Sequence, residues 1–318
     1  MHFYLGVDVG SVSTDLVLID EECSVVHKVY LRTQGQPIRT IKEGLRILSE
    51  EATADAEIAA AGATGSGRNL AAVIIGADVI KNEITTHAVA AVNLVPDVQT
   101  IIEIGGQDSK MILLHNGIVS DFSMNTVCAA GTGSFLDQQA SRLNIPIEEF
   151  GAYALKSSNP VRIAGRCSVF AESDMIHKQQ LGHRLEDLIA GLCQALVRNY
   201  LNNVGKGKQI LSPVVFQGGV AANKGIKRAF EEELQMEIIV PEHYHFMGAI
   251  GAAILARNNF KETGKTNFRG FKIVDIDYDV SSFECRDCPN LCEVINIYID
   301  GALTSRWGGR CGKWETTN

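Results

Sequence analysis

Two similar stretches, GVDVGSVSTDLVLI at residues 6–19 and IEIGGQDSKMILL at residues 102–114, decide how this chain of 318 residues folds. Laid over each other at a shift of 95 positions, they align Asp8 with Glu103, together with the glycine that lies two residues after each. Each copy has an apolar strand ending in an acidic residue, then a glycine turn, then a second apolar strand. We therefore predict an internal duplication of a βββαβαβα unit, an α/β fold with two similar domains facing each other across a cleft.

Hydrophobic periodicity places the remaining elements of each copy. Short runs rich in β-branched residues predict strands, and apolar residues three and four positions apart predict helices. In the first copy we expect strands at residues 3–9, 15–20, 25–31 and 58–65 and helices at 37–51, 70–75 and 83–94. In the second copy we expect strands at 100–106, 109–117, 118–125, 212–219 and 237–240, a helical region up to residue 203, and helices at 221–235 and 247–257.

These elements predict two domains and an appendage. The first domain covers residues 1–97 and is completed by the helix at about 247–258, and the second covers residues 98–246. The polar stretch FKETGKTNFRG then predicts a linker, so that residues 259–318 form a linker and a small cysteine-rich C-terminal extension.

Composition limits the classes of function. With 46% hydrophobic and 21% charged residues, the chain can bury a sizeable core. A net charge of -8 and the lack of a long basic run argue against binding to nucleic acids or to anionic membranes. The N-terminus MHFYLGVDVGS leads directly into a strand pattern, without the features of a signal peptide, and no spanning segment is visible. We expect a cytoplasmic protein whose eight cysteines are kept reduced.

Three glycine turns at strand ends predict phosphate and nucleotide binding. They are DVGS at residues 8–11, GGQD at 105–108 and QGGVA at 217–221. Such turns let backbone N–H groups approach phosphate oxygens, and neighbouring carboxylates can hold Mg²⁺ through water. A single glycine at a strand end is more often ordinary hairpin chemistry, but three at corresponding positions of a duplicated unit favour a nucleotide cleft.

Two cysteines lie immediately before predicted helices, Cys128 in NTVCAAGTGSFLDQQ and Cys167 in GRCSVFAESDMIHKQQ. A helix N-terminus favours negative charge, so a thiolate and several free N–H groups would share one place. Isolated cysteines are usually small buried hydrophobes, and we interpret Cys23 and Cys193 in that way.

On these motifs the chain resembles the superfamily of acetate kinase, sugar kinases, Hsp70 and actin. VDVGSVSTD and EIGGQDSK are similar to its two phosphate motifs, and FQGGVAANKG is similar to its adenosine motif. Together with the two cysteine motifs, they resemble the activators of 2-hydroxyacyl-CoA dehydratases and the ATPase subunits of benzoyl-CoA reductases over residues 3–257. The resemblance implies two ribonuclease H-like, actin-like ATPase domains.

The resemblance also implies roles for individual residues. Those that would organise Mg²⁺ and the attacking water are Asp8, Glu103, Gln107 and Asp108. Those that would hold phosphates or another part of ATP or ADP are Gly10, Ser11, Val12, Ser13, Thr14, Gly105, Gly106, Lys110, Gly131, Thr132 and Gly133, and the adenosine would lie along Gly218, Gly219 and Asn223.

The cysteine pair suggests a shared iron–sulfur cluster. Two thiolates are too few for a [4Fe-4S] cluster, which usually takes four, but a two-fold homodimer would supply Cys128 and Cys167 twice. The family resemblance then implies an ATPase that passes low-potential electrons from a ferredoxin or flavodoxin to a partner iron–sulfur dehydratase or reductase. Two alternatives remain open at this point, a sugar-type small-molecule kinase of the same fold and a nucleotide-dependent binding module without redox chemistry.

Four further cysteines cluster near the C-terminus: Cys285, Cys288, Cys292 and Cys311. Four close thiols suit tetrahedral zinc or a second iron–sulfur cluster, and the alternative is a compact hairpin with free cysteines. Four histidines at irregular spacings we interpret as solvated or capping residues: His177, His183, His243 and His245.

Overall fold

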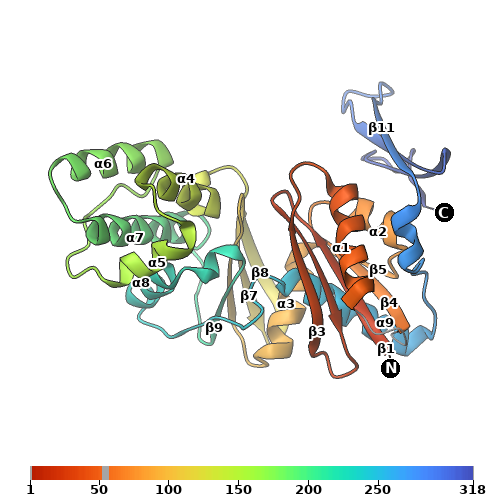
Figure 1. Cartoon of the computed structure of the whole chain (residues 1–318), viewed down its shortest axis with the longest axis horizontal. Helices are drawn as coiled ribbons and strands as arrows, with labels where there is room; N and C mark the ends of the chain where they lie inside the picture. Colours follow the sequence, from red (N-terminus) through yellow and green to blue (C-terminus); the bar gives the residue numbers. More distant parts are fainter. Residues whose placement is uncertain (1, 52–56, 318) are drawn as a thin grey trace. The chain divides into compact units, whose positions relative to one another are not determined.

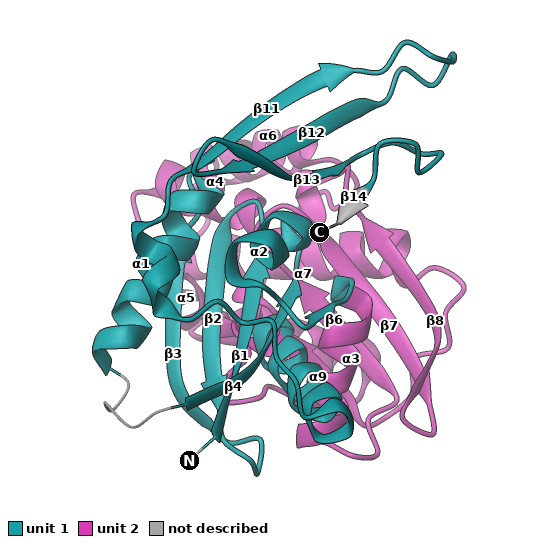
Figure 2. Ribbon diagram, turned by 90° about the vertical axis from the view of Figure 1, so that its right-hand side faces the viewer, with its two compact units in different colours: residues 1–83, 248–318 teal, residues 84–247 magenta. Residues whose placement is uncertain are grey.

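Two five-stranded mixed sheets with the same strand order carry the fold. In the computed structural model, which describes residues 2–51 and 57–317, the first sheet has the order β3-β2-β1-β4-β5 and the second β8-β7-β6-β9-β10. The chain divides into unit 1, residues 1–83 with 248–318, and unit 2, residues 84–247 (Figure 2).

The elements follow one another in the order drawn in Figure 1. The first copy contains β1 (His2–Val9), β2 (Ser13–Ile19), β3 (Val25–Arg32), α1 (Pro37–Glu51), β4 (Glu57–Thr64), α2 (Arg68–Ile75), β5 (Val79–Ile80) and α3 (Glu83–Leu94). The second contains β6 (Thr100–Ile104), β7 (Ser109–His115), β8 (Ile118–Asn125), a 3-10 turn (Ala129–Gly131), α4 (Gly133–Leu143), α5 (Ile147–Leu155), α6 (Ser168–Gln180), α7 (Leu185–Asn203), β9 (Val214–Gln217), a second 3-10 turn (Gly219–Ala222), α8 (Lys224–Leu234), β10 (Ile238–Ile239) and α9 (Met247–Thr263).

Strand pairing confirms the predicted duplication. In unit 1, β1 pairs with β2 antiparallel and with β4 parallel, and Asp8 lies opposite Asp15. In unit 2, β6 pairs with β7 antiparallel and with β9 parallel, and Glu103 lies opposite Lys110. The two opposed pairs correspond at the same shift of 95 residues, since 8 and 15 become 103 and 110. The predicted α/β class with two similar halves and a small C-terminal element is therefore confirmed.

The last helix of each copy is counted with the other copy's unit. Apart from its first residue, α3 belongs to unit 2, whereas α9 from Gly248 onward belongs to unit 1. The division between the units thus falls between Glu83 and Ile84, earlier than the boundary at residue 97 that the sequence suggested.

Helix α9 packs on the first sheet at a distance that only glycine permits. A Cβ atom on Gly6 would lie 1.8 Å from the carbonyl oxygen of Ala249, and one on Gly62 would lie 2.2 Å from that of Ala252. Both glycines sit on neighbouring strands, β1 and β4, and both would strike main-chain atoms that cannot rotate away. The backbone of α9 therefore lies directly against the middle of the sheet.

Helix α9 ends at Thr263, so the predicted end at Arg257 is wrong. The polar composition of this segment suggested a linker, but the extra turn is anchored by Phe260, whose ring lies 6.2 Å from that of Tyr4 on β1. Gly264 stops the helix with a positive φ of 62°.

A four-stranded sheet follows in the order β11-β12-β13-β14. Its strands are β11 (Tyr278–Glu284), β12 (Glu293–Ile299), β13 (Ala302–Trp307) and β14 (Thr316–Thr317). The 3-10 turn Phe271–Asp275 ahead of it inserts Ile273, 1% exposed, into the core of unit 1, and Lys42 of α1 donates to the carbonyl oxygen of Ile276 at 2.8 Å. Among the described residues, no helix has the length and apolar character needed to cross a membrane.

We predict that Gly6→Ala destabilises the chain by about 1–3 kcal/mol, because the added methyl group overpacks a rigid main-chain contact. The matched control is Gly309→Ala, whose Cβ would meet nothing closer than 3.5 Å. Urea unfolding of both variants checks the prediction, and equal midpoints for the two would contradict the packing of α9 described above.

Candidate functional site

The first glycine turn, between β1 and β2, is held closed from inside unit 1. The N–H of Gly10 donates to the carbonyl oxygen of Ser13 at 2.8 Å, and Thr33 Oγ1 donates to the carbonyl oxygen of Gly10 at 3.0 Å. Ser11 is exposed at the tip, and Val12 and Ser13 are half-buried. Thr14 is different, because its fully buried hydroxyl lies 3.0 Å from that of Thr33 and supports the turn from below.

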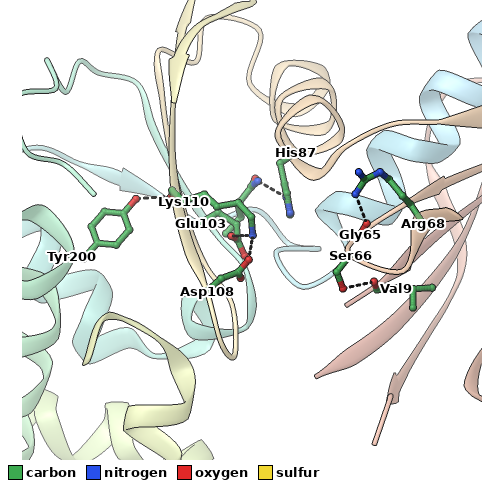
Figure 3. A network of polar contacts seen from close by, with 10 residues as sticks. Val9, Gly65, Ser66, Arg68, His87, Glu103, Asp108, Lys110 and Tyr200 are labelled. Carbon is green, nitrogen blue, oxygen red and sulfur yellow. Dashed lines mark hydrogen bonds and ion pairs between the residues drawn. The ribbon is translucent and has the colours of Figure 1, made fainter. Parts of the chain in front are cut away.

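The carboxylate of Asp8 lies beside this turn, between two glycines of unit 1. A Cβ on Gly65, which has a φ of 89°, would lie 2.4 Å from Asp8 Oδ1, and one on Gly248 would lie 1.9 Å from Oδ2. Gly248 belongs to the first turn of α9, where the helix dipole favours negative charge. The loop after β4, which contains Gly65, is tied to β1 by Ser66, which donates to the carbonyl oxygen of Val9 (Figure 3).

Asp15 is a buried acid facing Asp8 across the β1–β2 pair. It is 6% exposed, Ser13 donates to its Oδ2 at 3.3 Å, and its Oδ1 is buried without a hydrogen-bond partner. Burial, and then the charge of Asp8, raise the pKa of Asp15 well above its ordinary value of 3.8. Two opposed carboxyl groups, one of them poorly satisfied, form a site that would favour a cation.

The second glycine turn, in unit 2, repeats the backbone geometry of the first but not its charges. The N–H of Gly105 donates to the carbonyl oxygen of Asp108 at 3.0 Å. Lys110 Nζ lies 2.9 Å from carboxylate oxygens of both Glu103 and Asp108, and the Tyr200 hydroxyl donates to the Lys110 carbonyl oxygen at 2.7 Å (Figure 3). Only Asp108, with a side chain 33% exposed, reaches the surface of this cluster.

The third turn follows β9 and is also built on close packing. Gly218 has a φ of 87°, and a Cβ there would lie 2.7 Å from Glu103 Oε1, as the one on Gly65 would lie beside Asp8. The Gly218 N–H donates to the carbonyl oxygen of Tyr244 at 2.9 Å. Glu103 therefore joins the second glycine turn to the turn for which the sequence predicts adenosine binding.

His245 lies beside this third turn and is not simply solvated. Its ring is half-buried, 3.8 Å from the position of a Cβ on Gly219, and its centroid lies 4.4 Å from that of Tyr244. Burial lowers the pKa of His245 and so favours the neutral form of the ring. Asn223 is the N-cap of α8, where its Oδ1 accepts from the N–H groups of Gly225 and Ile226.

Two peptide hydrogen bonds connect the second glycine turn to the segment that carries Cys128. The N–H of Gly133 donates to the carbonyl oxygen of Gly105 at 2.9 Å, and the N–H of Ser134 donates to that of Gly106 at 2.8 Å. These are the first N–H groups of α4, which the sequence analysis expected to be free. They instead donate hydrogen bonds to the glycine turn. Cys128 itself is the N-cap of the preceding 3-10 turn. The Asn125 side chain accepts from its N–H at 2.9 Å and donates to its carbonyl oxygen at 2.8 Å.

Cys167, the N-cap of α6, is held near the same segment by two buried or partly buried side chains. Asn199 on α7, 2% exposed, donates to the carbonyl oxygen of Gly165 at 2.6 Å, and its Oδ1 would lie 2.9 Å from a Cβ on Gly131. Glu172 on α6 accepts from Gln138 on α4 at 3.0 Å and pairs with Arg142. The helices that follow the two cysteines, α4 and α6, are therefore linked, and Figure 1 draws them side by side.

The two thiols are available at the surface of unit 2. Cys128 and Cys167 are free and half-exposed, next to the exposed apolar side chains of Val127 (94%), Val169 (66%) and Phe170 (68%). Of the two cysteines interpreted as buried hydrophobes, Cys193 is 1% exposed, and burial raises its pKa to about 12. The interpretation of Cys23 is wrong, because this residue is half-exposed at a φ of 67° in the β2–β3 turn.

The C-terminal cysteines gather at one end of the β11–β12 hairpin. Cys285 is 8% exposed, Cys292 is half-exposed, and Cys288 and Cys311 are exposed. Over residues 2–51 and 57–317, no three His, Cys, Asp or Glu side chains are arranged to hold a metal ion.

Comparison with known proteins agrees with this geometry. Residues 5–256 match the family described as BadF/BadG/BcrA/BcrD ATPases. The chain belongs to this family. The (R)-2-hydroxyglutaryl-CoA dehydratase activating ATPase of Acidaminococcus fermentans is 37% identical over 261 residues, which are 80% of this chain and 96% of that protein. One of the subunits of the benzoyl-CoA reductase of Thauera aromatica is 28% identical over 78% of this chain and 91% of its own length.

A solved structure of the same family contains a nucleotide analogue. It is the activator of the 2-hydroxyisocaproyl-CoA dehydratase from Clostridium difficile with bound ADPNP, with a TM-score of 0.74, 33% identity, and coverage of 82% of this chain and 97% of that one. The resemblance predicted from the sequence is therefore confirmed, the chain is an ATPase of this family, and a sugar-type kinase is less supported. Residues 257–318, with the C-terminal cysteines, lie outside the family match.

Several residues of this region were not found from the sequence. Asp15 could have been noticed as an acid inside an apolar strand, and Thr33 bears no such sign. Asn199 and Glu172 lie on helices far along the chain from the turns they hold, so no local pattern reveals them.

We predict that Asp15→Asn raises the melting temperature of the nucleotide-free chain at about pH 8, and that this advantage shrinks towards about pH 4. The folded state holds the Asp15 proton more tightly than the unfolded state does, because its pKa is raised. The stabilisation by that proton is complete at low pH and is lost as the pH rises through the folded pKa. Thermal unfolding across this range checks the prediction.

Asp20→Asn is the control for removing one carboxylate from the same unit, since Asn keeps the oxygen that accepts from the N–H groups of Glu22 and Ser24. A constant difference between Asp15→Asn and the unchanged chain at every pH would contradict the raised pKa.

Proposed function

We propose that this protein is an ATP-dependent reductive activator, a homodimeric [4Fe-4S] ATPase that couples ATP hydrolysis to delivery of low-potential electrons to a partner iron–sulfur enzyme. The observation that carries the proposal is the pair of hydrogen bonds from Gly133 and Ser134 to the carbonyl groups of Gly105 and Gly106. They join a phosphate turn directly to the segment of Cys128. A kinase needs phosphate turns, but it has no use for such a connection to a surface thiol.

ATP hydrolysis would use the three turns in the roles that the family resemblance implies. Backbone N–H groups of the turns after β1 and β6 hold phosphate oxygens, and the turn after β9, with His245 beside it, holds the adenosine. The Asp8–Asp15 pair would hold Mg²⁺, because two carboxylates across one strand pair can compensate its charge. Asp108, whose side chain is the most exposed of its cluster, would orient the water that attacks the γ-phosphate to give ADP and phosphate.

The residues around Cys128 and Cys167 fit a cluster shared between two copies of the chain. Both thiols are free and half-exposed, and both lie at the start of a helical segment. The N–H groups at the start of α6 follow Cys167 directly and can stabilise negative charge. A [4Fe-4S] cluster bound there by four thiolates would supply a one-electron carrier.

The apolar surface around the thiols supports the homodimer. Val127, Val169 and Phe170 are large side chains that the single chain leaves mostly in water. A second copy seated over them would bury this surface and bring the missing two thiols in one isologous contact. A two-fold dimer supplies the four thiolates that the cluster needs, two from each copy. This match favours a dimer over a monomer with another ligand set.

Hydrogen bonds within unit 2 would couple the nucleotide state to the cluster. A change of position of Gly105–Gly106 on loss of the γ-phosphate is passed through two peptide hydrogen bonds to the start of α4, and Asn199 and Glu172 carry it to the Cys167 segment. The dimer contact is then the element with two arrangements that the nucleotide biases. The electron donor would be a ferredoxin or flavodoxin, and the acceptor a 2-hydroxyacyl-CoA dehydratase or a related reductase, as for the named relatives.

We predict that Cys128→Ser and Cys167→Ser each abolish iron binding and leave ATP affinity within about twofold, because neither thiol belongs to the glycine turns. The unchanged chain, purified without oxygen, should hold about two iron atoms per chain, as expected for one shared cluster with four irons. Iron and sulfide analysis with nucleotide titration provides the measurement. Cys23→Ser, a half-exposed cysteine in unit 1, is the control and should keep its iron.

Full iron content in either variant would refute the assignment of the cluster. ATP hydrolysis that requires an added sugar would instead establish the kinase, and a colourless protein without ATPase activity would indicate a nucleotide-dependent binding module.

We predict that Gly133→Ala weakens the coupling while the iron content is unchanged. Its Cβ would press on the carbonyl oxygen of Gly105 at 3.1 Å and on Val220 at 3.2 Å, which displaces α4 from the turn. ATP-dependent electron delivery should fall by about tenfold, or about 1.4 kcal/mol of coupling free energy. The difference between the ADP and ATP forms in the EPR spectrum should shrink as well.

Ser134→Ala is the graded control, because it loses a side-chain hydrogen bond to the carbonyl oxygen of Gly106 but keeps the peptide hydrogen bond to it. An unchanged ADP-to-ATP difference in Gly133→Ala would show that the connection does not transmit the signal.

A further inference from the structure

The C-terminal sheet brings four cysteines to one end, although they come from two separate loops. Cys285 and Cys292 continue the β11–β12 register that ends at Glu284 opposite Glu293, and the Cys285 N–H donates to the Cys292 carbonyl oxygen at 2.8 Å. Side chains directly opposite each other in antiparallel strands lie on the same face, with Cβ atoms about 4.5–5.5 Å apart. Cys288 lies in the turn between them, where its carbonyl oxygen accepts from the N–H of Leu291.

The loop that carries Cys311 folds back onto this same end. Trp314, three residues later, donates from Nε1 to Cys285 Sγ at 3.2 Å, and its ring packs edge-to-face on Phe283 with centroids 5.1 Å apart. Lys313 forms an ion pair with Asp287, which lies between Cys285 and Cys288. Two side-chain contacts from residues close to Cys311 therefore hold its loop against the turn that carries the other three thiols.

The sheet itself has little apolar material to hold it together. Along β11, no side chain is fully buried, and most are exposed. The fully buried apolar side chains of β12 and β13 are only Val294 and Ile297. Small sheets with so little core usually need a disulfide or a metal ion to stay folded. All four cysteines are free thiols, so a disulfide does not fill that need.

We propose that Cys285, Cys288, Cys292 and Cys311 bind one zinc ion that fixes the tip of the β11–β12 hairpin to the loop after β13. A tetrahedral Zn–S distance of about 2.3 Å places sulfur atoms about 3.8 Å apart, which suits two cross-strand neighbours. Arg306, whose guanidinium lies 5.3 Å from the Trp314 ring centroid, offsets part of the excess negative charge of four thiolates, whereas the charge of Lys313 is already paired with Asp287.

A single ion suits this end better than an iron–sulfur cluster, because zinc holds a small fold together without redox chemistry. The indole of Trp314 donates to Cys285 Sγ and its ring packs on Phe283, so the loop after β13 already lies beside this thiol. The four thiols are not yet arranged as a metal site among the described residues. Convergence on zinc requires the exposed side chains of Cys288 and Cys311 to rotate inward, whereas Cys285 can still accept from Trp314 once its sulfur binds the ion.

Metal analysis of the full-length chain, purified without oxygen from zinc-supplemented medium, tests the proposal. The unchanged protein should contain about one zinc per chain, and Cys288→Ser and Cys311→Ser should each fall below about one tenth of that value. Both side chains are exposed, so circular dichroism should show that α/β structure persists in the variants. Cys23→Ser is the matched control and should keep its zinc.

Titration of the zinc-depleted chain with Co²⁺ gives an independent measurement, since tetrahedral thiolate ligation produces intense visible bands that the two serine variants should lack. No zinc in the unchanged protein, zinc retained in both variants, or iron lost from them in place of zinc would each overturn the proposal. The outcome is separate from that of the shared cluster, because Cys128→Ser should lose iron and keep zinc.

Discussion

The hydrogen bonds from Gly133 and Ser134 to the carbonyl groups of Gly105 and Gly106 are the constraint on which the functional arrangement of unit 2 depends. The first N–H groups of α4 donate to a glycine turn, so a movement of the helix without the turn would break these hydrogen bonds. Because Asn125 fixes the Cys128 peptide groups and Asn199 fixes the loop before Cys167, the two thiols share that dependence. A continuous set of hydrogen bonds thus connects the second glycine turn with the segments that carry both thiols.

The duplication explains why the same contact between an acid and a glycine occurs in both units. In each unit a strand-end acid lies against a glycine of positive φ at the end of the neighbouring parallel strand, Asp8 against Gly65 and Glu103 against Gly218. A side chain at either glycine would collide with the carboxylate, so the acid and the glycine form one structural feature. The chain belongs to an ATPase family, and this repeated feature is the part of its fold that positions both carboxylates.

Much of this could be predicted from the sequence, because it is local. Strand alternation and glycine turns predicted nine of the ten strands of the two sheets to within two residues at each end, but missed the two-residue strand β5. Helix-start context singled out Cys128 and Cys167. What could not be predicted depends on partners distant in sequence. Phe260 extends α9 by packing on Tyr4. The motif alone would place Thr14 on the glycine turn, but its hydroxyl is buried below that turn beside the hydroxyl of Thr33. Asn199 looks like any polar residue of a helix until its neighbours are known.

The two copies differ in the charge of their opposed strand-end pairs. Where unit 1 sets Asp8 opposite Asp15, a pair of charge -2 when both are ionised, unit 2 sets Glu103 opposite Lys110, a pair of charge zero. In the copy with two acids, a divalent cation would offset their repulsion and would displace the Asp15 proton at a pH below the raised pKa. In unit 2, Lys110 also lies 2.9 Å from a carboxylate oxygen of Asp108, so the three side chains together carry a formal charge of -1. A lysine in place of an acid at this position thus leaves the strand-end site of unit 2 less negative than that of unit 1.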